Sequence, residues 1–190
     1  MNPHKSEFDP NSGVLFVVIE TPKGSRNKFD FDFEHESFVL GGVLPAGASF
    51  PFDFGFAPGT VGEDGDPLDV LVLMDESAFA GCLVESRLIG VIEAAQTERD
   101  GQTMRNDRLI AVADNSHAQR DVKNLKDLPR VTVDEIEHFF ASYNVINGKK
   151  FKPLGRGDAK RAGELLREGE KTHAKKHAKK RRNSSAKKPK

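Results

Sequence analysis

Residues 63–74 read EDGDPLDVLVLM, in which a cluster of acidic side chains runs directly into an apolar segment. The length and composition of residues 68–74 are typical of a buried β-strand. Gly- and Pro-rich turns separate similar short apolar or alternating segments elsewhere in the chain. These segments are residues 14–20, 28–33, 37–43, 82–95 and 108–113. Short strands in succession favour an antiparallel barrel or sandwich over a parallel sheet.

Helical patterns appear only late in the chain. Thr132 and Glu135 have the spacing of a capping box, and the apolar face that follows predicts a helix. A second helix is expected to begin near Asp158. The apolar face of the first helix consists of Ile136, Phe139, Phe140 and Tyr143. The sequence therefore predicts a mainly β (α+β) protein, an antiparallel β-barrel with two or so C-terminal covering helices.

The formal net charge of zero conceals two oppositely charged parts. Residues 171–190 contain 10 Lys and Arg residues and no acid, so residues 1–170 hold 19 basic against 29 acidic residues. The C-terminal segment repeats HAKK and has almost no bulky apolar residue, which predicts a disordered basic tail after a folded domain of residues 1–170. Such a tail either only solubilises the protein or contacts nucleic acid or another polyanion by neutralising phosphates.

The composition also bears on the cellular compartment. No apolar run approaches the ~20 residues of a membrane-spanning helix, and Met1 is not followed by the basic and apolar regions of a secretory signal. The single cysteine, Cys82, cannot form an internal disulfide, and the six histidines show no spacing typical of zinc sites. We therefore expect a cytoplasmic protein that makes no membrane contact.

The acidic cluster is the strongest candidate for a functional site. In an extended chain Asp64 and Asp66 point to the same side, about 7 Å apart. Pro67 stiffens the backbone and Asp69 opens the strand, so three carboxylates can converge on one point. Carboxylate oxygens suit Mg²⁺ or Mn²⁺. The alternative is a solvated acidic turn, whereas the residue pattern excludes an EF-hand.

Other segments hold groups that a cation site for a phosphate substrate would use. Glu20 ends the first predicted strand, and Lys28 either faces a phosphate or is an ordinary surface lysine. Asp107 and Arg108 lie in a polar segment that, taken alone, reads as a hairpin loop. Tyr143 is the only tyrosine, and it is either a core aromatic with a solvated hydroxyl or a phosphate ligand.

The segments FPFDFGFAPGT (residues 50–60) and EDGDPLDVLVL (residues 63–73) together resemble the soluble inorganic pyrophosphatases. The signature of that family is Asp-x-Asp-Pro-x-Asp, preceded by an aromatic-Pro-x-x-aromatic-Gly-aromatic segment. The order of segments follows the family over about residues 14–155. The resemblance implies an OB-like barrel, Mg²⁺-dependent hydrolysis of pyrophosphate by a metal-activated water, and a homo-oligomer.

The resemblance also implies roles for the acidic residues. Asp64 and Asp69 match metal ligands, with Asp69 bridging two cations, and Asp66 matches the group that accepts a proton from the attacking water. Glu20 matches the outer acidic pocket, where it holds water or a further cation. Asp107 is a candidate to complete the second metal site, and Glu98 and Asp100 in the same polar segment are alternatives.

On the substrate side, the resemblance assigns phosphate contacts to Lys28 and Tyr143, and Arg108 replaces a lysine of the family. Four further positions depart from the family pattern. Gly42 replaces an arginine, Phe54 a tyrosine, Asn106 a metal-binding aspartate and Asn144 a lysine.

These departures keep two other hypotheses open. The first is a diverged pyrophosphatase-like paralogue that is weakly active or acts on another phosphoanhydride. The second is a non-catalytic OB-like module that binds nucleic acid. The second is less favoured, because the acidic body has no basic groove with interleaved aromatic residues.

Overall fold

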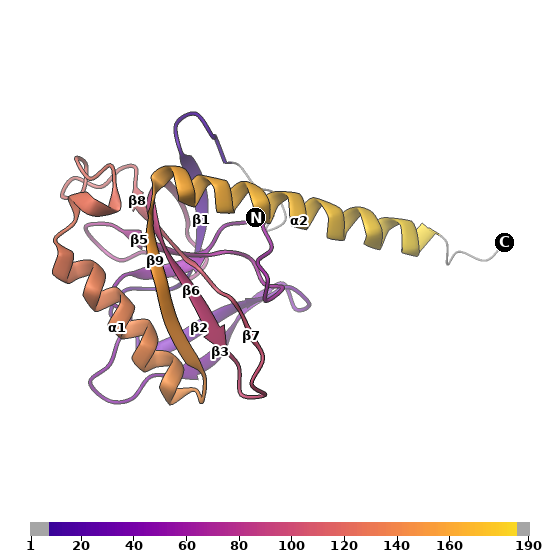
Figure 1. Ribbon diagram of the computed structural model, residues 1–190, viewed down its shortest axis with the longest axis horizontal. Coiled ribbons are helices and arrows are strands. Elements are labelled where there is room, and N and C mark those ends of the chain that lie inside the picture. The colour runs from indigo at the N-terminus through magenta and orange to yellow at the C-terminus, as the bar shows by residue number, and fades with distance from the viewer. Residues whose placement is uncertain (1–7, 186–190) are drawn as a thin grey trace.

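The structure is a computed structural model that describes residues 8–185, with side chains described as far as residue 179. It contains strands, one 3₁₀ turn and two helices, arranged as Figure 1 shows. The elements are β1 (Val14–Thr21), β2 (Asn27–Asp32), β3 (Ser37–Val43), β4 (Asp53–Phe56), β5 (Asp69–Leu73), β6 (Leu83–Thr97), β7 (Thr103–Arg105), β8 (Arg108–Ala113), η1 (Leu125–Asp127), α1 (Arg130–Ile146), β9 (Lys150–Asp158) and α2 (Ala159–Ser185).

The main sheet closes into a ring. Strands β1, β4, β5, β8 and β6 pair in that order, and β6 pairs back to β1. Strands β7 and β9 extend from β6, while β2 and β3 form a separate hairpin. The predicted mainly antiparallel fold is confirmed. Its one exception among these pairings is β5 with β8, which run parallel because the long strand β6 carries the chain back between them.

The strands of the ring are buried on both faces. Leu71 and Leu73 lie in the core that α1 covers, whereas Val70 and Val72 lie in the core that α2 covers. A strand with both faces buried needs apolar side chains at successive positions. This explains why β5 and β8 have continuous apolar sequences rather than an alternating pattern.

Helix α1 begins three residues earlier than the expected capping box predicts. It begins at Arg130 with Pro129 as its N-cap, and no side chain caps it, so the expected capping box of Thr132 and Glu135 is wrong. Proline is well suited to a helix start because it has no N–H group that would lack a partner there. The predicted apolar face is confirmed, since Ile136 and Phe140 are fully buried.

Helix α2 extends from Ala159 to Ser185 and projects beyond the body (Figure 1). The structure describes residues 171–185 as the continuation of this helix, where the sequence predicts disorder, and residues 186–190 lie outside the described part of the chain. The physical reason is that the first turns of α2 are held by the burial of Ala162 and Leu166. Adding residues to an existing helix is far easier than nucleating one, and the Ala- and Lys-rich continuation favours this growth.

Strand β9 is not predicted by the sequence. It contains Pro153, Gly155 and Gly157, which are residues typical of turns. The strand forms because it pairs along β6, with a register shift between Glu93 and Ala94.

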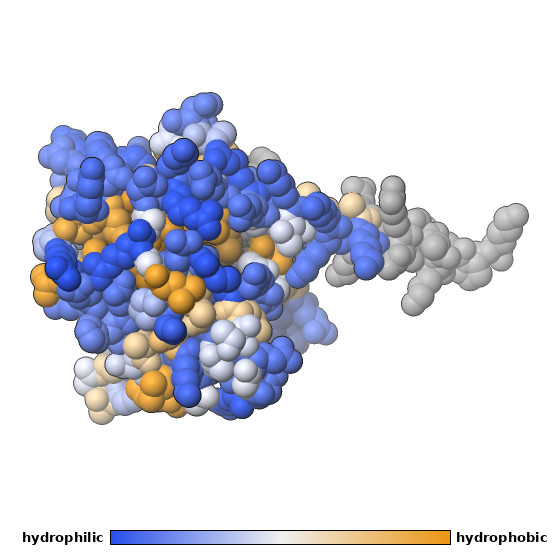
Figure 2. All heavy atoms as spheres, in the orientation of Figure 1, coloured by the Kyte–Doolittle hydropathy of each residue, from blue (hydrophilic) through white to orange (hydrophobic). Residues whose placement is uncertain are grey.

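The part of α2 that projects from the body is hydrophilic at its surface. Hydrophilic side chains cover α2 where it leaves the body (Figure 2). No helix in the described part of the chain is both long and apolar enough to cross a membrane.

Candidate active site

All the principal candidate residues from the sequence except Asp107 line a single open cavity of about 610 Å³, called here the main cavity. These residues come from β1, β2, the loop before β5, β5 itself, β8 and α1. The cavity therefore lies where separate parts of the ring, the β2–β3 hairpin and α1 meet. The candidates that line it are Glu20, Lys28, Asp64, Asp66, Asp69, Arg108 and Tyr143.

An irregularity in β1 directs Glu20 into the main cavity. The pairing of β1 with β4 shifts between Ile19 and Thr21, so Glu20 is the extra residue of a bulge. Bulges of this kind re-aim a side chain near a functional site. Glu20 Oε1 accepts a hydrogen bond of 2.7 Å from the backbone N–H of Phe31, which ties this carboxylate to β2.

Lys28 lies between two carboxylates. Its Nζ is 3.7 Å from Glu20 Oε2, forms an ion pair with Asp30 Oδ1 and donates to Phe29 O at 2.7 Å. Burial by itself lowers the pKa of Lys28, but the charges of Glu20 and Asp30 outweigh this and raise it. The lysine is therefore cationic, and it faces the main cavity over the ring of Phe54 at 5.0 Å.

The loop before β5 holds its acidic residues by backbone hydrogen bonds. Gly62 N–H donates to Asp66 O at 2.7 Å, and Asp66 N–H donates to Asp64 Oδ1 at 3.1 Å. Gly65 has a φ of +98°, a conformation that other residues adopt at a cost. Within the described residues no hydrogen bond involves the exposed carboxylate of Asp66. This carboxylate is therefore free to act on a ligand.

Arg108 is the most constrained side chain of the main cavity. Its Nη1 donates both to Asp69 Oδ2 and to Asn106 Oδ1. The guanidinium carbon lies 4.8 Å from the ring centroid of Phe140 and 5.5 Å from that of Phe151. Arginine stacks favourably on aromatic faces, so the two rings fix the guanidinium beside Asp69.

Two residues at the end of α1 differ in what they offer the cavity. Tyr143 is half-buried and stacks on Phe139 with 5.9 Å between ring centroids, and burial raises the pKa of its hydroxyl. The hydroxyl is therefore a neutral donor. Asn144 lines the same cavity, but its Nδ2 donates to Phe140 O at 2.9 Å within the helix.

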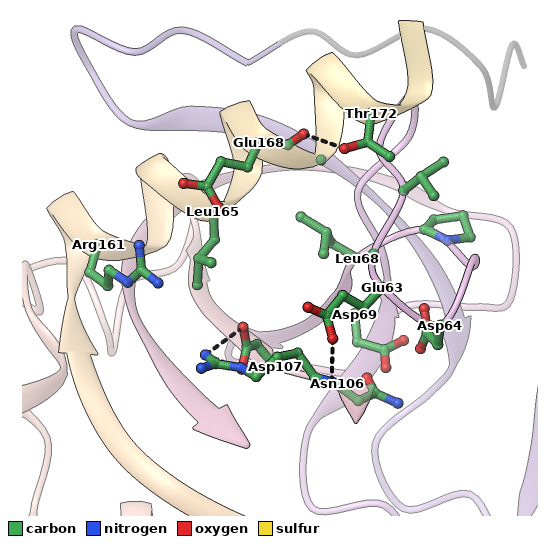
Figure 3. Close-up of a pocket in the computed structure, with 15 residues that line it drawn as sticks. Glu63, Asp64, Leu68, Asp69, Asn106, Asp107, Arg161, Leu165, Glu168 and Thr172 are labelled. Carbon is green, nitrogen blue, oxygen red and sulfur yellow. Dashed lines mark hydrogen bonds and ion pairs between the residues drawn. The ribbon is translucent and has the colours of Figure 1, made fainter. Parts of the chain in front are cut away.

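Asp107 lies in a neighbouring cavity of about 360 Å³ between the acidic loop and α2 (Figure 3). Its Oδ1 accepts a hydrogen bond of 2.8 Å from Ala94 N–H and also binds the Arg105 guanidinium. The Asp107 carboxylate therefore stabilises the local packing of β6 and β7. Asp64 and Asp69 line both cavities.

Gln96, Glu98 and Lys149 also line the main cavity, and of these Glu98 is one of the acids that the sequence offers for the second metal site. Lys149 forms an ion pair with Glu98 at 2.8 Å, and Gln96 donates to the same carboxylate at 2.6 Å. They lie at the end of β6 and just before β9. The sequence gives no signal for Gln96, because the pairing of β6 with β9 is not evident from it.

The carboxylates of the main cavity repel one another in a poorly solvated space. Burial raises the pKa of Glu20 to about 7 and, together with the nearby charges of Asp69 and Asp66, that of Asp64 to about 6. Burial also raises the pKa of Asp69, against the opposing charge of Arg108. Crowded carboxylates of this kind favour a cation among them.

The donor set fits a hard divalent ion in its chemistry, since it consists of carboxylate oxygens. Within the described residues, no three acidic, histidine or cysteine side chains are grouped closely enough to hold an ion as they stand. The side chains of Asp64 and Asp69 would therefore have to close around it.

The raised pKa of Glu20 predicts a measurable effect of pH on stability. The folded protein holds a proton on Glu20 that the unfolded chain releases, so this stabilising contribution is complete below about pH 4.5 and is lost as the pH rises to about 7. It amounts to at most roughly 3 kcal/mol. We expect Glu20→Gln to reduce the difference in melting temperature between pH 5.5 and pH 8, measured without divalent cations.

The control is Glu76→Gln, which neutralises an exposed carboxylate. If the difference in melting temperature between pH 5.5 and pH 8 is the same in Glu20→Gln as in the wild type, Glu20 is charged throughout this pH range.

Comparisons with known proteins agree with this site. The family model described as inorganic pyrophosphatase matches residues 17–174. The inorganic pyrophosphatase of Nostoc sp. is 38% identical over 157 residues, which cover 83% of this chain and 90% of the relative. The inorganic pyrophosphatase of Haloferax volcanii is 36% identical over 162 residues, which cover 84% and 89%.

Solved structures of inorganic pyrophosphatases have the same fold as this chain. The inorganic pyrophosphatase of Thermus thermophilus superposes with a TM-score of 0.82 at 32% identity, covering 92% of this chain and 99% of that one. The enzyme of Helicobacter pylori gives a TM-score of 0.79 at 32% identity, with coverages of 90% and 98%. By the matched residues, the relatives and the fold, this chain belongs to the inorganic pyrophosphatase family.

Proposed function

We propose that this enzyme hydrolyses inorganic pyrophosphate to two phosphates in the main cavity and that it requires Mg²⁺. The observation that carries the proposal is the convergence of Asp64, Asp66 and Asp69 on one cavity that also contains Lys28 and Tyr143. Acidic and cationic groups thus face the same space, as a highly charged anion that arrives with cations requires.

The acidic loop would supply the metal ligands and the proton acceptor. Asp64 and Asp69 would hold the ions, with Glu20 at the outer edge of the same cavity. When bound, the ions neutralise the substrate and acidify the attacking water. Asp66 would take the proton from that water, since its carboxylate is exposed and has no partner within the described residues. A positioned carboxylate of this kind acts as a general base.

The cationic and hydroxyl groups would orient the substrate. Lys28 Nζ and the neutral Tyr143 hydroxyl face the cavity and would donate to phosphate oxygens. Arg108 would add charge near the reacting end, where its position beside Asp69 is fixed by two aromatic rings. Lys149 also lines the cavity and is a further donor.

The proposal is tested by measuring phosphate release from pyrophosphate and from nucleoside polyphosphates, with Mg²⁺ and with a chelator. We expect release from pyrophosphate that depends on Mg²⁺. Release only from a nucleoside polyphosphate would instead support the diverged paralogue, for which the missing arginine at Gly42 and the missing hydroxyl at Phe54 leave room for a larger substrate. Loss of Mg²⁺ dependence would contradict the metal assignment.

Gly41 provides a test of how Lys28 is positioned. Gly41 is the extra residue of β3, where Lys28 pairs with Gly42 and Phe29 pairs with Leu40. A Cβ at Gly41 would lie 1.7 Å from Asp30 Oδ2, so Gly41→Ala must displace that carboxylate and its ion pair with Lys28. A misplacement of ~1 Å costs up to ~10²-fold in rate. We therefore expect turnover to fall by about tenfold or more.

The matched control for this prediction is Gly42→Ala. A Cβ at Gly42 has no atom within 4 Å, and its φ is not positive. Equal turnover in the two variants would show that Asp30 does not position Lys28 for the reaction.

We also propose that the enzyme is a homo-oligomer. Support comes from exposed apolar side chains on the β2–β3 hairpin, including Leu40 and Val43, which are 58% and 59% exposed. Apolar patches of this kind are typical of interaction surfaces. Light scattering of the purified protein and of Leu40→Glu tests this proposal.

We also propose a cytoplasmic location for the enzyme. The support is its single cysteine, Cys82, which is a free thiol, as is usual for proteins of a reducing compartment.

The basic part of α2 is proposed to contact nucleic acid. Its exposed lysines include Lys171, Lys175 and Lys179, and no bulky apolar residue lies beside them for membrane insertion. A triple Lys→Gln variant at these positions should lose affinity for an oligonucleotide and should lower the salt dependence of binding. Unchanged binding would contradict the proposal, and equal competition by heparin would indicate a general polyanion contact.

A further inference from the structure

A cationic side chain of the protein itself, that of Arg108, lies beside Asp69 in the folded chain. Asp69 begins β5 and Arg108 begins β8, and the parallel register of these strands pairs the two residues directly. Neighbouring residues in register project to the same face of a sheet. The ion pair of Arg108 with Asp69 is therefore built into the strand pairing of the ring.

Burial and stacking restrict the Arg108 side chain to this position. The side chain is 5% exposed, and the rings of Phe140 and Phe151 lie over its guanidinium. Leaving Asp69 would require the guanidinium to give up both rings as well as its hydrogen bonds. The pair is thus more constrained than an ion pair at the surface, where the side chains move freely.

The neighbouring residue strengthens the pair. Asn106 Oδ1 accepts a hydrogen bond from the same Nη1, and Figure 3 shows Asn106 beside Asp69. Because Asn106 is an amide, Asp69 is the only carboxylate paired with Arg108 among the described residues. One oxygen of Asp69, Oδ2, is therefore occupied by a positive charge of the protein itself.

We propose that Arg108 is a resident cation of the metal site, which takes one side of the Asp69 carboxylate in place of a divalent ion. The enzyme then binds divalent ions at Asp69 more weakly than its number of acidic residues indicates. Asp64 and Asp69 Oδ1 remain for an ion on the other side. This inference rests on the proposed function, since it assumes that Asp64 and Asp69 hold the metal.

The test counts Mn²⁺ bound to the substrate-free enzyme, using the electron paramagnetic resonance signal of free Mn²⁺. Arg108→Gln removes the resident charge and keeps a hydrogen-bonding side chain. We expect it to bind Mn²⁺ on the order of tenfold more tightly, or to bind an additional ion, because the competing positive charge is gone. The double variant Arg108→Gln/Asp69→Asn should lose this gain.

The control is Arg130→Gln. Arg130 is 88% exposed and lies 3.8 Å from Asp134, so its loss changes the net charge equally but far less in the main cavity. Should Arg108→Gln fold poorly, Arg108→Lys retains a charge without the planar fork and should show an intermediate Mn²⁺ affinity. The rise in melting temperature with Mn²⁺ is a second measurement, and it should be larger in either variant than in the wild type.

Two outcomes would separate the possible failures. Equal Mn²⁺ number and affinity in the wild type and Arg108→Gln would overturn the inference, because Arg108 would then leave Asp69 when the ion binds. Failure of every variant and of the wild type to bind Mn²⁺ would overturn the metal assignment of the proposed function, and the inference with it.

Discussion

Asp66→Asn is expected to lower the turnover of pyrophosphate by on the order of 10²–10⁴-fold, because it removes the proposed proton acceptor while keeping the size of the side chain. The structural role of residue 66 lies in its backbone. Its carbonyl accepts from Gly62 and its N–H donates to Asp64, and asparagine retains both. The melting temperature should therefore change little. Steady-state kinetics at saturating Mg²⁺ and a thermal melt measure the two effects separately.

Glu63→Gln is the matched control for this experiment. Glu63 belongs to the same loop, but it lines only the neighbouring cavity, where its carboxylate accepts a hydrogen bond from Arg105 N–H at 2.8 Å. The substitution removes one negative charge from the loop and preserves an acceptor. Near-normal turnover of Asp66→Asn, or an equal loss in Glu63→Gln, would contradict the assignment of Asp66 as the base.

Gly42→Arg combined with Phe54→Tyr is expected to raise the turnover of pyrophosphate by about tenfold to a hundredfold. Gly42 pairs directly with Lys28 across the β2–β3 hairpin, so a side chain at position 42 lies on the face of the hairpin that carries Lys28. A Cβ there meets no atom within 4 Å. An arginine would thus have space to reach the phosphate side of the cavity. A preorganised donor of this kind typically contributes ~10²-fold or more to the rate.

The control places the same charge at the other end of the hairpin. Ser37 begins β3, is exposed and pairs with Asp32, so Ser37→Arg adds an arginine that is not paired with Lys28. Initial rates across a Mg²⁺ series compare the double variant, the control and the wild type. A fast wild type that gains nothing from Gly42→Arg would show that other groups, such as Lys149 or Arg108, already supply the missing donors.

Much of the fold follows from patterns of neighbouring residues. The apolar segments at residues 14–20 and 108–113 became β1 and β8 with nearly the predicted bounds, because burial on both faces selects continuous apolar side chains. Strand β9 could not be predicted, since its proline and glycines are typical of turns and only the pairing with β6 holds it extended. The helical continuation of α2 was missed for a related reason, because composition alone does not show that its first turns are held by the core.

The candidate site likewise combines features that the sequence predicts with contacts that only the tertiary structure reveals. The spacing of Asp64, Asp66 and Asp69 is local, so their convergence was evident from the sequence and its resemblance to a family. The neighbours of Asp107 were not evident, because the hydrogen bond to Ala94 and the ion pair with Arg105 depend on how β6, β7 and β8 pack.

The sequence by itself determined what depends on neighbouring residues: the strands of the ring, the turn that presents three carboxylates, and the apolar faces of the helices. Only the tertiary structure decided which charges meet. Glu20 reaches Lys28 because of a bulge in β1, and Arg108 reaches Asp69 because β5 and β8 pair in parallel. These contacts join residues far apart in the chain, and their strength depends on burial, which sequence spacing does not reveal.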